Sequence, residues 1–237
     1  MTSPQKVVFL FDVNNTLLDN DRVQDDLRSH LEHEFGTETR YRYFAILEEL
    51  YAELGYTDYL GVSQRYRLEG MCGPRMLMMP AFLVDYPFAS RLYPGSLDAL
   101  ELEHVRSWGK TVILSDGDVV FQPRKVQRSG LWEAVEGRVL IYIHKEQMLD
   151  DVEQRYPARH YVMIDDKPRI LTAMKRIWGD RLTTVWAGQG HYELDSNASA
   201  IPPTTDFTIE RIGDLVNYDL PVLLGVFKAG HAQQEEP

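Results

Sequence analysis

The segment Lys6–Thr16, with the sequence KVVFLFDVNNT, decides how this chain folds. Val7–Phe11 is a run of five apolar residues without alternation, a pattern typical of a strand buried on both faces of a parallel sheet. Polar residues follow at once, with Asp12, Asn14 and Thr16. In open parallel sheets, functional groups gather just past the carboxyl ends of the strands. The segment therefore predicts a central strand and a candidate site at its end.

Residues 20–91, which follow this strand, change to a helical period. Val23, Leu27, Leu31 and Phe35 recur every four residues up to Gly36. A second apolar stripe ends before Gly55 and consists of Tyr43, Phe44, Leu47, Leu50, Tyr51 and Leu54. We therefore expect residues 20–91 to form an all-helical insert.

Beyond Gly95 the sequence alternates between helical and strand patterns. Ser96 can cap a helix that carries Val105 and Trp108 and closes at Gly109. Four further apolar strands are expected, at 111–114, 139–143, 161–164 and 183–186. Repeated strand–helix units of this length indicate an α/β fold, with a Rossmann-like parallel sheet covered by helices on both faces.

Composition narrows the class of protein. The 237 residues carry a net charge of −11, and nucleic-acid binders concentrate positive charge instead, so no nucleic-acid partner is expected. The apolar runs are a handful of residues long, whereas a membrane span needs roughly 20. Residues 1–6 show no apolar secretory segment, and Cys72 is the only cysteine. We expect a cytoplasmic protein, monomeric or homodimeric, without a membrane partner.

Polar side chains follow several of the predicted strands. Ser115 follows the strand at 111–114, Lys145 lies two residues past the strand at 139–143, and Asp165 and Asp166 follow the strand at 161–164. Each alone is better explained by a structural role, since an aspartate or serine after a strand is commonly a helix N-cap. Together with Asp12 they indicate phosphoryl transfer to a carboxylate, because three carboxylates in one place need a cation.

The chemistry of these groups is complementary. Carboxylate oxygens are the ligands that Mg²⁺ prefers, and Lys145 supplies positive charge for both phosphate and aspartate. Ser115 offers a hydroxyl, and the turn formed with Asp116 and Gly117 can aim backbone N–H groups at a phosphate oxygen, so we expect Asp116 and Gly117 to bind substrate. The expected substrate is a small-molecule phosphate ester.

Four segments resemble the four motifs of the haloacid dehalogenase (HAD) superfamily in order and spacing. They are Asp12–Thr16, Ile113–Ser115, Lys145 and the paired-aspartate segment Val162–Asp166. The resemblance covers nearly the whole chain. One class of this superfamily carries a cap between motifs one and two, so the resemblance implies a cap domain at 20–91 and a core of residues 1–19 and 92–237.

The resemblance also implies roles for the motif residues. Asp12 would attack the phosphate and form an aspartyl-phosphate, which water then hydrolyses, while Ser115 and Lys145 bind the transferring group. Thr16 would orient the motif loop and bind the substrate. Mg²⁺ would be held by Asp12, the backbone carbonyl of Asn14, and Asp165 or Asp166.

Asn14 departs from the family pattern, which usually has an acid/base aspartate at this position. An amide has no titrating proton, and loss of a general acid/base typically costs about 10²–10⁴-fold in rate. Three explanations are open: an introduced substitution, a natural enzyme whose chemistry needs no acid there, or a binding-only relative. The alternatives to an impaired phosphohydrolase are therefore a hydrolytic haloacid dehalogenase and a non-catalytic phospho-ligand binder.

The predicted cap is rich in arginine and tyrosine. Any one of Arg40, Arg42, Arg65 and Arg67 could hold an anionic substrate tail, although a solvated helix face is the more ordinary use of such residues.

Overall fold

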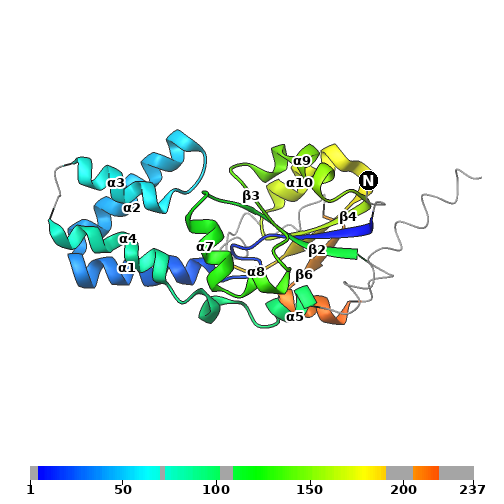
Figure 1. Cartoon of the computed structure of the whole chain (residues 1–237), viewed down its shortest axis with the longest axis horizontal. Coiled ribbons are helices and arrows are strands. Elements are labelled where there is room, and N and C mark those ends of the chain that lie inside the picture. Colours follow the sequence, from blue (N-terminus) through cyan, green and yellow to red (C-terminus); the bar gives the residue numbers. More distant parts are fainter. Residues whose placement is uncertain (1–4, 70–72, 102–108, 191–204, 219–237) are drawn as a thin grey trace, which may run out of the picture.

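The core of the molecule is a parallel β-sheet. The computed structural model describes residues 5–69, 73–101, 109–190 and 205–218. Within them, six parallel strands are ordered β3-β2-β1-β4-β5-β6 (Figure 1). Their bounds are β1 Gln5–Phe11, β2 Gly109–Asp116, β3 Val139–Tyr142, β4 Ala158–Asp165, β5 Leu182–Ala187 and β6 Phe207–Ile209.

Strand β1 is central because every residue of Val7–Phe11 can be buried. It pairs with β2 on one side and β4 on the other, with Phe11 level with Ile113 and Ile164. The backbone N–H of Asp12 still donates to the Ile164 carbonyl at 3.0 Å. The carboxyl ends of these three strands therefore meet at one edge, where the strand order reverses and ligands of such sheets bind.

Side chains alternate across β1 and divide the core into two layers. Phe9 and Phe11 pack with α5 (Ser96–Glu101), α7 (Phe121–Arg128) and α8 (Leu131–Ala134). Val8 and Leu10 pack on the opposite face with α9 (Leu149–Arg155) and α10 (Pro168–Trp178). Both faces of the sheet are therefore covered, which explains why the strand sequence does not alternate.

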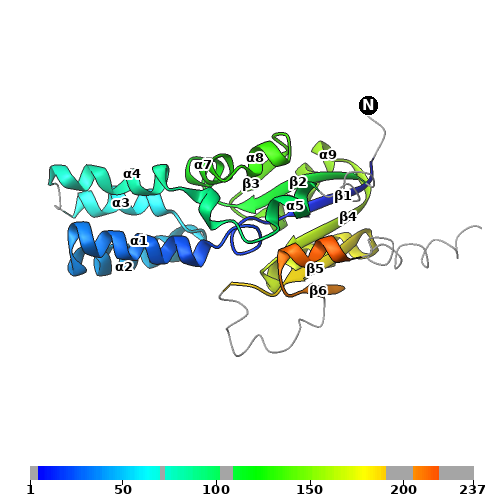
Figure 2. The same cartoon turned by 90° about the horizontal axis from the view of Figure 1, so that it is seen from below.

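The first four helices after β1 form a lobe at one end of the molecule (Figures 1 and 2). This helical lobe, residues 20–91, contains α1 (Asn20–Phe35), α2 (Thr37–Leu54), α3 (Tyr59–Leu68), α4 (Met79–Asp85) and the 3₁₀ segments Pro74–Met78 and Phe88–Arg91. Asp19 caps α1 by accepting from the N–H of Arg22 at 2.9 Å. Gly55 ends α2 in a left-handed conformation.

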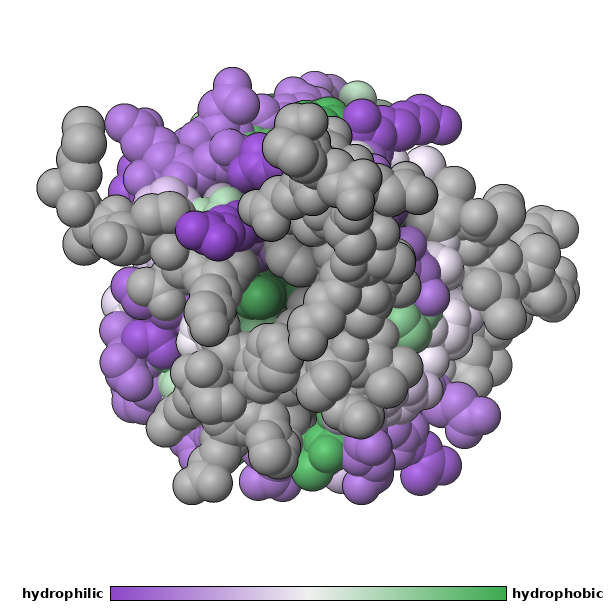
Figure 3. Space-filling view, turned by 90° about the vertical axis from the view of Figure 1, so that its right-hand side faces the viewer, coloured by the Kyte–Doolittle hydropathy of each residue, from purple (hydrophilic) through white to green (hydrophobic). Residues whose placement is uncertain are grey.

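Figure 3 shows the end of the molecule opposite the helical lobe. Seen from that end, the described residues are largely hydrophilic, with small separate hydrophobic areas (Figure 3). Within the described ranges, no helix combines the length and the apolar character needed to span a bilayer.

The predicted fold class, an α/β fold with a parallel Rossmann-like sheet, is confirmed. Two details differ. Gly109, expected to end a helix, instead begins β2, because a Cβ there would lie 1.9 Å from the Val7 carbonyl oxygen and only glycine allows the strands this approach. The predicted helix positions Val105 and Trp108 lie outside the described residues. Strand β6 was not predicted, since three residues carry too little periodicity.

Candidate active site

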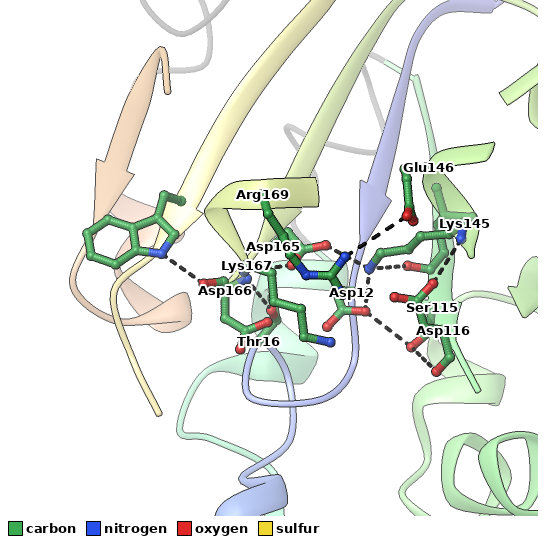
Figure 4. A network of polar contacts seen from close by, with 12 residues as sticks. Asp12, Thr16, Ser115, Asp116, Lys145, Glu146, Asp165, Asp166, Lys167 and Arg169 are labelled. Atoms are coloured by element: carbon green, nitrogen blue, oxygen red, sulfur yellow. Dashed lines mark hydrogen bonds and ion pairs between the residues drawn. The ribbon is translucent and has the colours of Figure 1, made fainter. Parts of the chain in front are cut away.

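The polar residues predicted at the strand ends lie together at the carboxyl edge of the sheet (Figure 4). Asp12 follows β1, Ser115 is the second-to-last residue of β2, and Lys145 starts the 3₁₀ segment after β3. Asp165 ends β4 and Asp166 follows it. All five are at most 1% exposed, so the site is a buried set of charges.

Asp12 is the centre of this set. Its Oδ1 accepts from Ser115 Oγ at 3.1 Å and from Lys145 Nζ at 2.5 Å, whereas its buried Oδ2 has no hydrogen-bond partner among the described residues. Burial raises the pKa of Asp12, but the ammonium groups of Lys145 and Lys167 outweigh burial and lower the pKa below its ordinary value. The chain therefore presents an ionised carboxylate with one oxygen unengaged.

Lys145 holds the strand ends together. Its Nζ lies 2.5 Å from Asp12 Oδ1 and 2.7 Å from Asp165 Oδ2, and it also donates to the Leu114 carbonyl at 3.3 Å. Burial opposes its charge, yet the two carboxylates raise the pKa of Lys145 well above the ordinary value. Its backbone N–H donates to Asp116 Oδ1 at 2.9 Å, which fixes the turn after β2 against the loop after β3.

Three carboxylates form a potential metal site. Asp12, Asp165 and Asp166 each have an oxygen within 4.8 Å of the others. Both carboxylate oxygens of Asp166 are buried and find no hydrogen-bond partner in the part of the chain that the structure describes. Burial together with neighbouring Asp165 raises the pKa of Asp166 well above its ordinary value. Unsatisfied hard oxygens in this grouping fit Mg²⁺, which would neutralise them.

Thr16 connects the first and last motif segments. Its Oγ1 accepts from the backbone N–H of Asp166 at 3.0 Å, and its side chain is fully buried. Trp186, which the sequence did not single out, donates from Nε1 to the Asp166 carbonyl at 2.9 Å. These contacts place the Thr16 hydroxyl against the backbone, outside the residues that line the cavity.

A cavity of about 270 Å³ lies between the sheet edge and the helical lobe. The sheet side contributes Asn14, Asp116 and Gly117, and the lobe contributes Tyr56 and Tyr59. The cavity has the size of a small metabolite, and its walls come from both parts of the chain.

The comparisons with known proteins agree with this geometry. No family model and no curated protein matches the chain. A solved structure from Burkholderia xenovorans LB400, described as a haloacid dehalogenase-like hydrolase, is 63% identical, with a TM-score of 0.85, over 91% of this chain and 100% of that one. The chain belongs to the HAD superfamily. The predicted resemblance is thereby confirmed.

More distant HAD structures share the fold. A haloacid dehalogenase-like hydrolase of Xanthomonas campestris is 15% identical with a TM-score of 0.65, covering 97% of this chain and 95% of that one. The HAD-hydrolase YfnB of Bacillus subtilis, solved with magnesium bound, is 16% identical with a TM-score of 0.59. The match covers 90% of this chain and 98% of that one. An L-2-haloacid dehalogenase of Xanthobacter autotrophicus also shares the fold, at 16% identity and a TM-score of 0.57 over 90% and 97%.

Lys125 is the main site residue of this HAD protein that the sequence did not reveal. It lies on α7, is 1% exposed and lines the cavity. Its Nζ donates to Asn14 Oδ1 at 2.7 Å and to Asn20 Oδ1 at 2.8 Å. Burial lowers the pKa of Lys125 to about 7. A lysine in a predicted helix gives no signal of this kind, since most lysines there are exposed.

Other cavity residues also come from loops and helices beyond the motifs. Gln122 donates from Nε2 to Ser115 Oγ at 3.0 Å, so it orients the hydroxyl beside Asp12. Additional polar or charged residues lining the cavity are Asn15, Asn20, Gln24, Asp118, His144, Lys167 and Arg169.

The arginines of the lobe do not reach the cavity. Arg65 pairs with Glu53 at 2.7 Å and Arg40 pairs with Glu32 at 3.0 Å, both on the surface, and Arg42 pairs with Glu49 and Glu69. None of the four predicted candidates is among the residues that line the cavity. The structure therefore favours the more ordinary use expected for these residues, a solvated helix face: Arg40, Arg42 and Arg65 pair with glutamates of the lobe.

Proposed function

We propose that this HAD-family hydrolase is a Mg²⁺-dependent phosphohydrolase that acts on a small phosphate ester through an aspartyl-phosphate on Asp12. One observation carries the proposal: the unengaged Oδ2 of Asp12 lies in a carboxylate cluster whose Asp166 has both oxygens unsatisfied. A nucleophilic carboxylate beside an unneutralised pair of aspartates suits a metal-assisted reaction at phosphorus.

In this proposal Asp12 Oδ2 attacks the phosphorus atom. Lys145 and the Ser115 hydroxyl, already on Asp12 Oδ1, hold the transferring phosphoryl group, and the backbone of Asp116 and Gly117 lines its pocket. Asp12, the backbone carbonyl of Asn14, and Asp165 or Asp166 would hold Mg²⁺. When bound, this ion would offset the negative charge of the phosphoryl group and the carboxylates.

The helical lobe would serve as the cap domain. It supplies Tyr51, Tyr56, Thr57 and Tyr59 to the cavity wall, so substrate in the cavity would contact both parts. Enclosure by the cap would exclude bulk water and strengthen the electrostatic interactions around Asp12. We propose that substrate selection resides on this wall and on the loops facing it.

Asn14 limits the reaction. Its amide can neither protonate a leaving group nor activate water. The first half-reaction can proceed when the leaving group is good, whereas hydrolysis of the aspartyl-phosphate is slow. We therefore expect low turnover from the unchanged chain.

The test is Mg²⁺-dependent release of phosphate from 4-nitrophenyl phosphate by the unchanged chain and by Asn14→Asp. Restoring a carboxyl group should raise turnover by about 10²-fold, since an acid/base contributes 10²–10⁴-fold. The matched control is the double variant Asp12→Asn with Asn14→Asp, which should stay inactive with the acid restored. An inert Asn14→Asp across a broad panel of phosphate esters would contradict the proposal.

A second candidate is a hydrolytic haloacid dehalogenase on the same scaffold, which Asn14 favours because halide departs without protonation. In that reaction Asp12 displaces the halide from carbon and needs no metal. Halide release from small 2-halo acids in the presence of a chelator would support this candidate over the phosphohydrolase.

A further inference from the structure

Lys125 is buried like Lys145, but its hydrogen-bond partners differ from those of Lys145. Lys145 contacts two carboxylates, but within the described part of the chain no carboxylate lies within ion-pair distance of Lys125. Its two hydrogen-bond acceptors are neutral amide oxygens. Burying an ammonium group without a counter-ion is costly, and a fold keeps such a group where it serves a ligand or a reaction.

The contact with Lys125 determines which way Asn14 faces. In its ammonium form Lys125 only donates hydrogen bonds, and Asn14 turns its Oδ1 toward Lys125 Nζ, at 2.7 Å. The Nδ2 group of Asn14 is then directed away from the lysine. Asn14 lines the cavity two residues after the nucleophile Asp12. The chain thus holds an amide N–H donor where an acid/base would otherwise lie.

The surroundings of Lys125 strengthen its effect on that amide. The Phe121 ring centroid lies 5.0 Å from Nζ and the Phe88 centroid lies 6.0 Å away. The second amide oxygen, Asn20 Oδ1, holds Nζ in place at 2.8 Å. A hydrogen bond from a charged donor in such a buried setting polarises the amide, which makes its N–H a stronger donor.

We propose that Asn14 Nδ2, held and polarised by Lys125, binds the leaving-group oxygen, and that the site is built for phosphate esters whose leaving group departs as an anion. Acyl, enol and aryl phosphates belong to this class. The inference rests on the proposed phosphohydrolase function. Asn14 contacts the substrate in this scheme, and Lys125 is a positioning residue that acts through the amide.

The step needs no proton. A bond forms between Asp12 Oδ2 and phosphorus, the bond between phosphorus and the leaving oxygen breaks, and its electron pair stays on that oxygen. The departing anion accepts a hydrogen bond from Asn14 Nδ2, and the ammonium form of Lys125 strengthens this bond by polarising the amide. A fixed donor of this kind stabilises developing charge without titrating.

The test is the dependence of rate on leaving-group basicity. First-turnover release of phenol is measured with Mg²⁺ for aryl phosphates whose phenols range from acidic (4-nitrophenol) to basic (4-methoxyphenol). The rate of phenol release by the unchanged chain should fall steeply as the phenol becomes more basic. Lys125→Met should lose about 10²-fold on the most basic phenol, as for removal of one oxyanion donor, and clearly less on 4-nitrophenol. Asn14→Asp should be nearly insensitive to the phenol.

Lys125→Met is expected to fold, because methionine fills a similar volume and removes an unpaired buried charge. Its melting temperature should equal or exceed that of the unchanged chain. An equal loss on every phenol would overturn the inference and indicate a structural role, as would release of 4-nitrophenol by Asn14→Asp but not by the unchanged chain. Failure of Asn14→Asp on all substrates would instead overturn the phosphohydrolase function itself.

Discussion

The helical lobe and the carboxyl edge of the sheet use charged residues in opposite ways. In the lobe, pairs such as Arg65–Glu53 lie on the surface, with both side chains at least one-third exposed. At the sheet edge, Asp12, Lys145 and Asp165 form a continuous ion-pair chain in which no side chain is more than 1% exposed. The sheet edge also holds Asp166, whose carboxylate has no hydrogen-bond partner within the described ranges.

The difference separates charges that water solvates from charges that the fold itself must compensate. Exposed pairs are screened by water and contribute little to stability. Buried charges cost several kcal/mol each to desolvate, as a rough figure, and persist only where partners or ligands compensate them. A charge that is both buried and incompletely compensated is therefore the better indicator of function in this fold.

The largest expected effect is the stabilisation of the protein by Mg²⁺, which would neutralise the Asp166 carboxylate. Mg²⁺ at about 100 times its dissociation constant should stabilise the protein by about 2.7 kcal/mol. For a chain of this size, that corresponds to a rise in melting temperature of roughly 5–10 °C. Asp166→Asn should lose most of the rise. Asp118→Asn, which removes a carboxylate that lines the cavity but is not part of the cluster, should keep it. An undiminished Mg²⁺ response in Asp166→Asn would show that this carboxylate is not a metal ligand.

His160 is buried but lies away from the candidate active site, so its titration tests the effect of burial on stability by itself. It lies in β4 near the end of the strand opposite to the site, is 3% exposed, and its Nε2 is 2.8 Å from Thr183 Oγ1. Burial lowers the pKa of His160 to about 4. The unfolded chain, with an ordinary pKa near 6.5, therefore binds the proton more tightly than the folded chain, and stability falls as pH drops from about 6.5 toward 4.

Replacing His160 by a neutral residue should remove this part of the acid sensitivity. At pH 5 the linkage amounts to about 2 kcal/mol, obtained from the two pKa values. The measurement is urea unfolding of the unchanged chain and of His160→Gln at pH 7.5 and pH 5. The stability difference between the two proteins should shift in favour of His160→Gln at the lower pH. A shift of zero would mean that the histidine is solvated in the folded state.

The smallest effect is expected in the lobe. Arg65→Gln removes the bidentate pair with Glu53, yet the urea midpoint and the activity should stay within experimental error, because water replaces the lost partner. Salt should likewise leave the difference between the two proteins unchanged. A clear loss of activity in Arg65→Gln, with stability retained, would contradict the comparison and make the lobe arginines candidate substrate contacts again.

The sequence alone predicted the parallel sheet and which residues at its strand ends lie together. Buried parallel strands give unbroken apolar runs, and the polar residues after them must meet at one edge. This rule is enough to bring Asp12, Ser115, Lys145 and Asp165 together. Weakly periodic or very short elements are harder to predict: β6 has three residues, and Gly109 follows a helical pattern although it begins β2.

Tertiary structure alone decided the setting of Asn14. The sequence established that Asn14 cannot carry a proton, since that is a property of the amide itself. The lysine that orients it is 111 positions away, on a helix whose pattern fixes which face is buried but not which neighbour each side chain meets. Helix periodicity is local, whereas the approach of Lys125 to Asn14 depends on how α7 packs against the loop after β1. That packing sets which way the amide of Asn14 faces, which no local pattern in the sequence encodes.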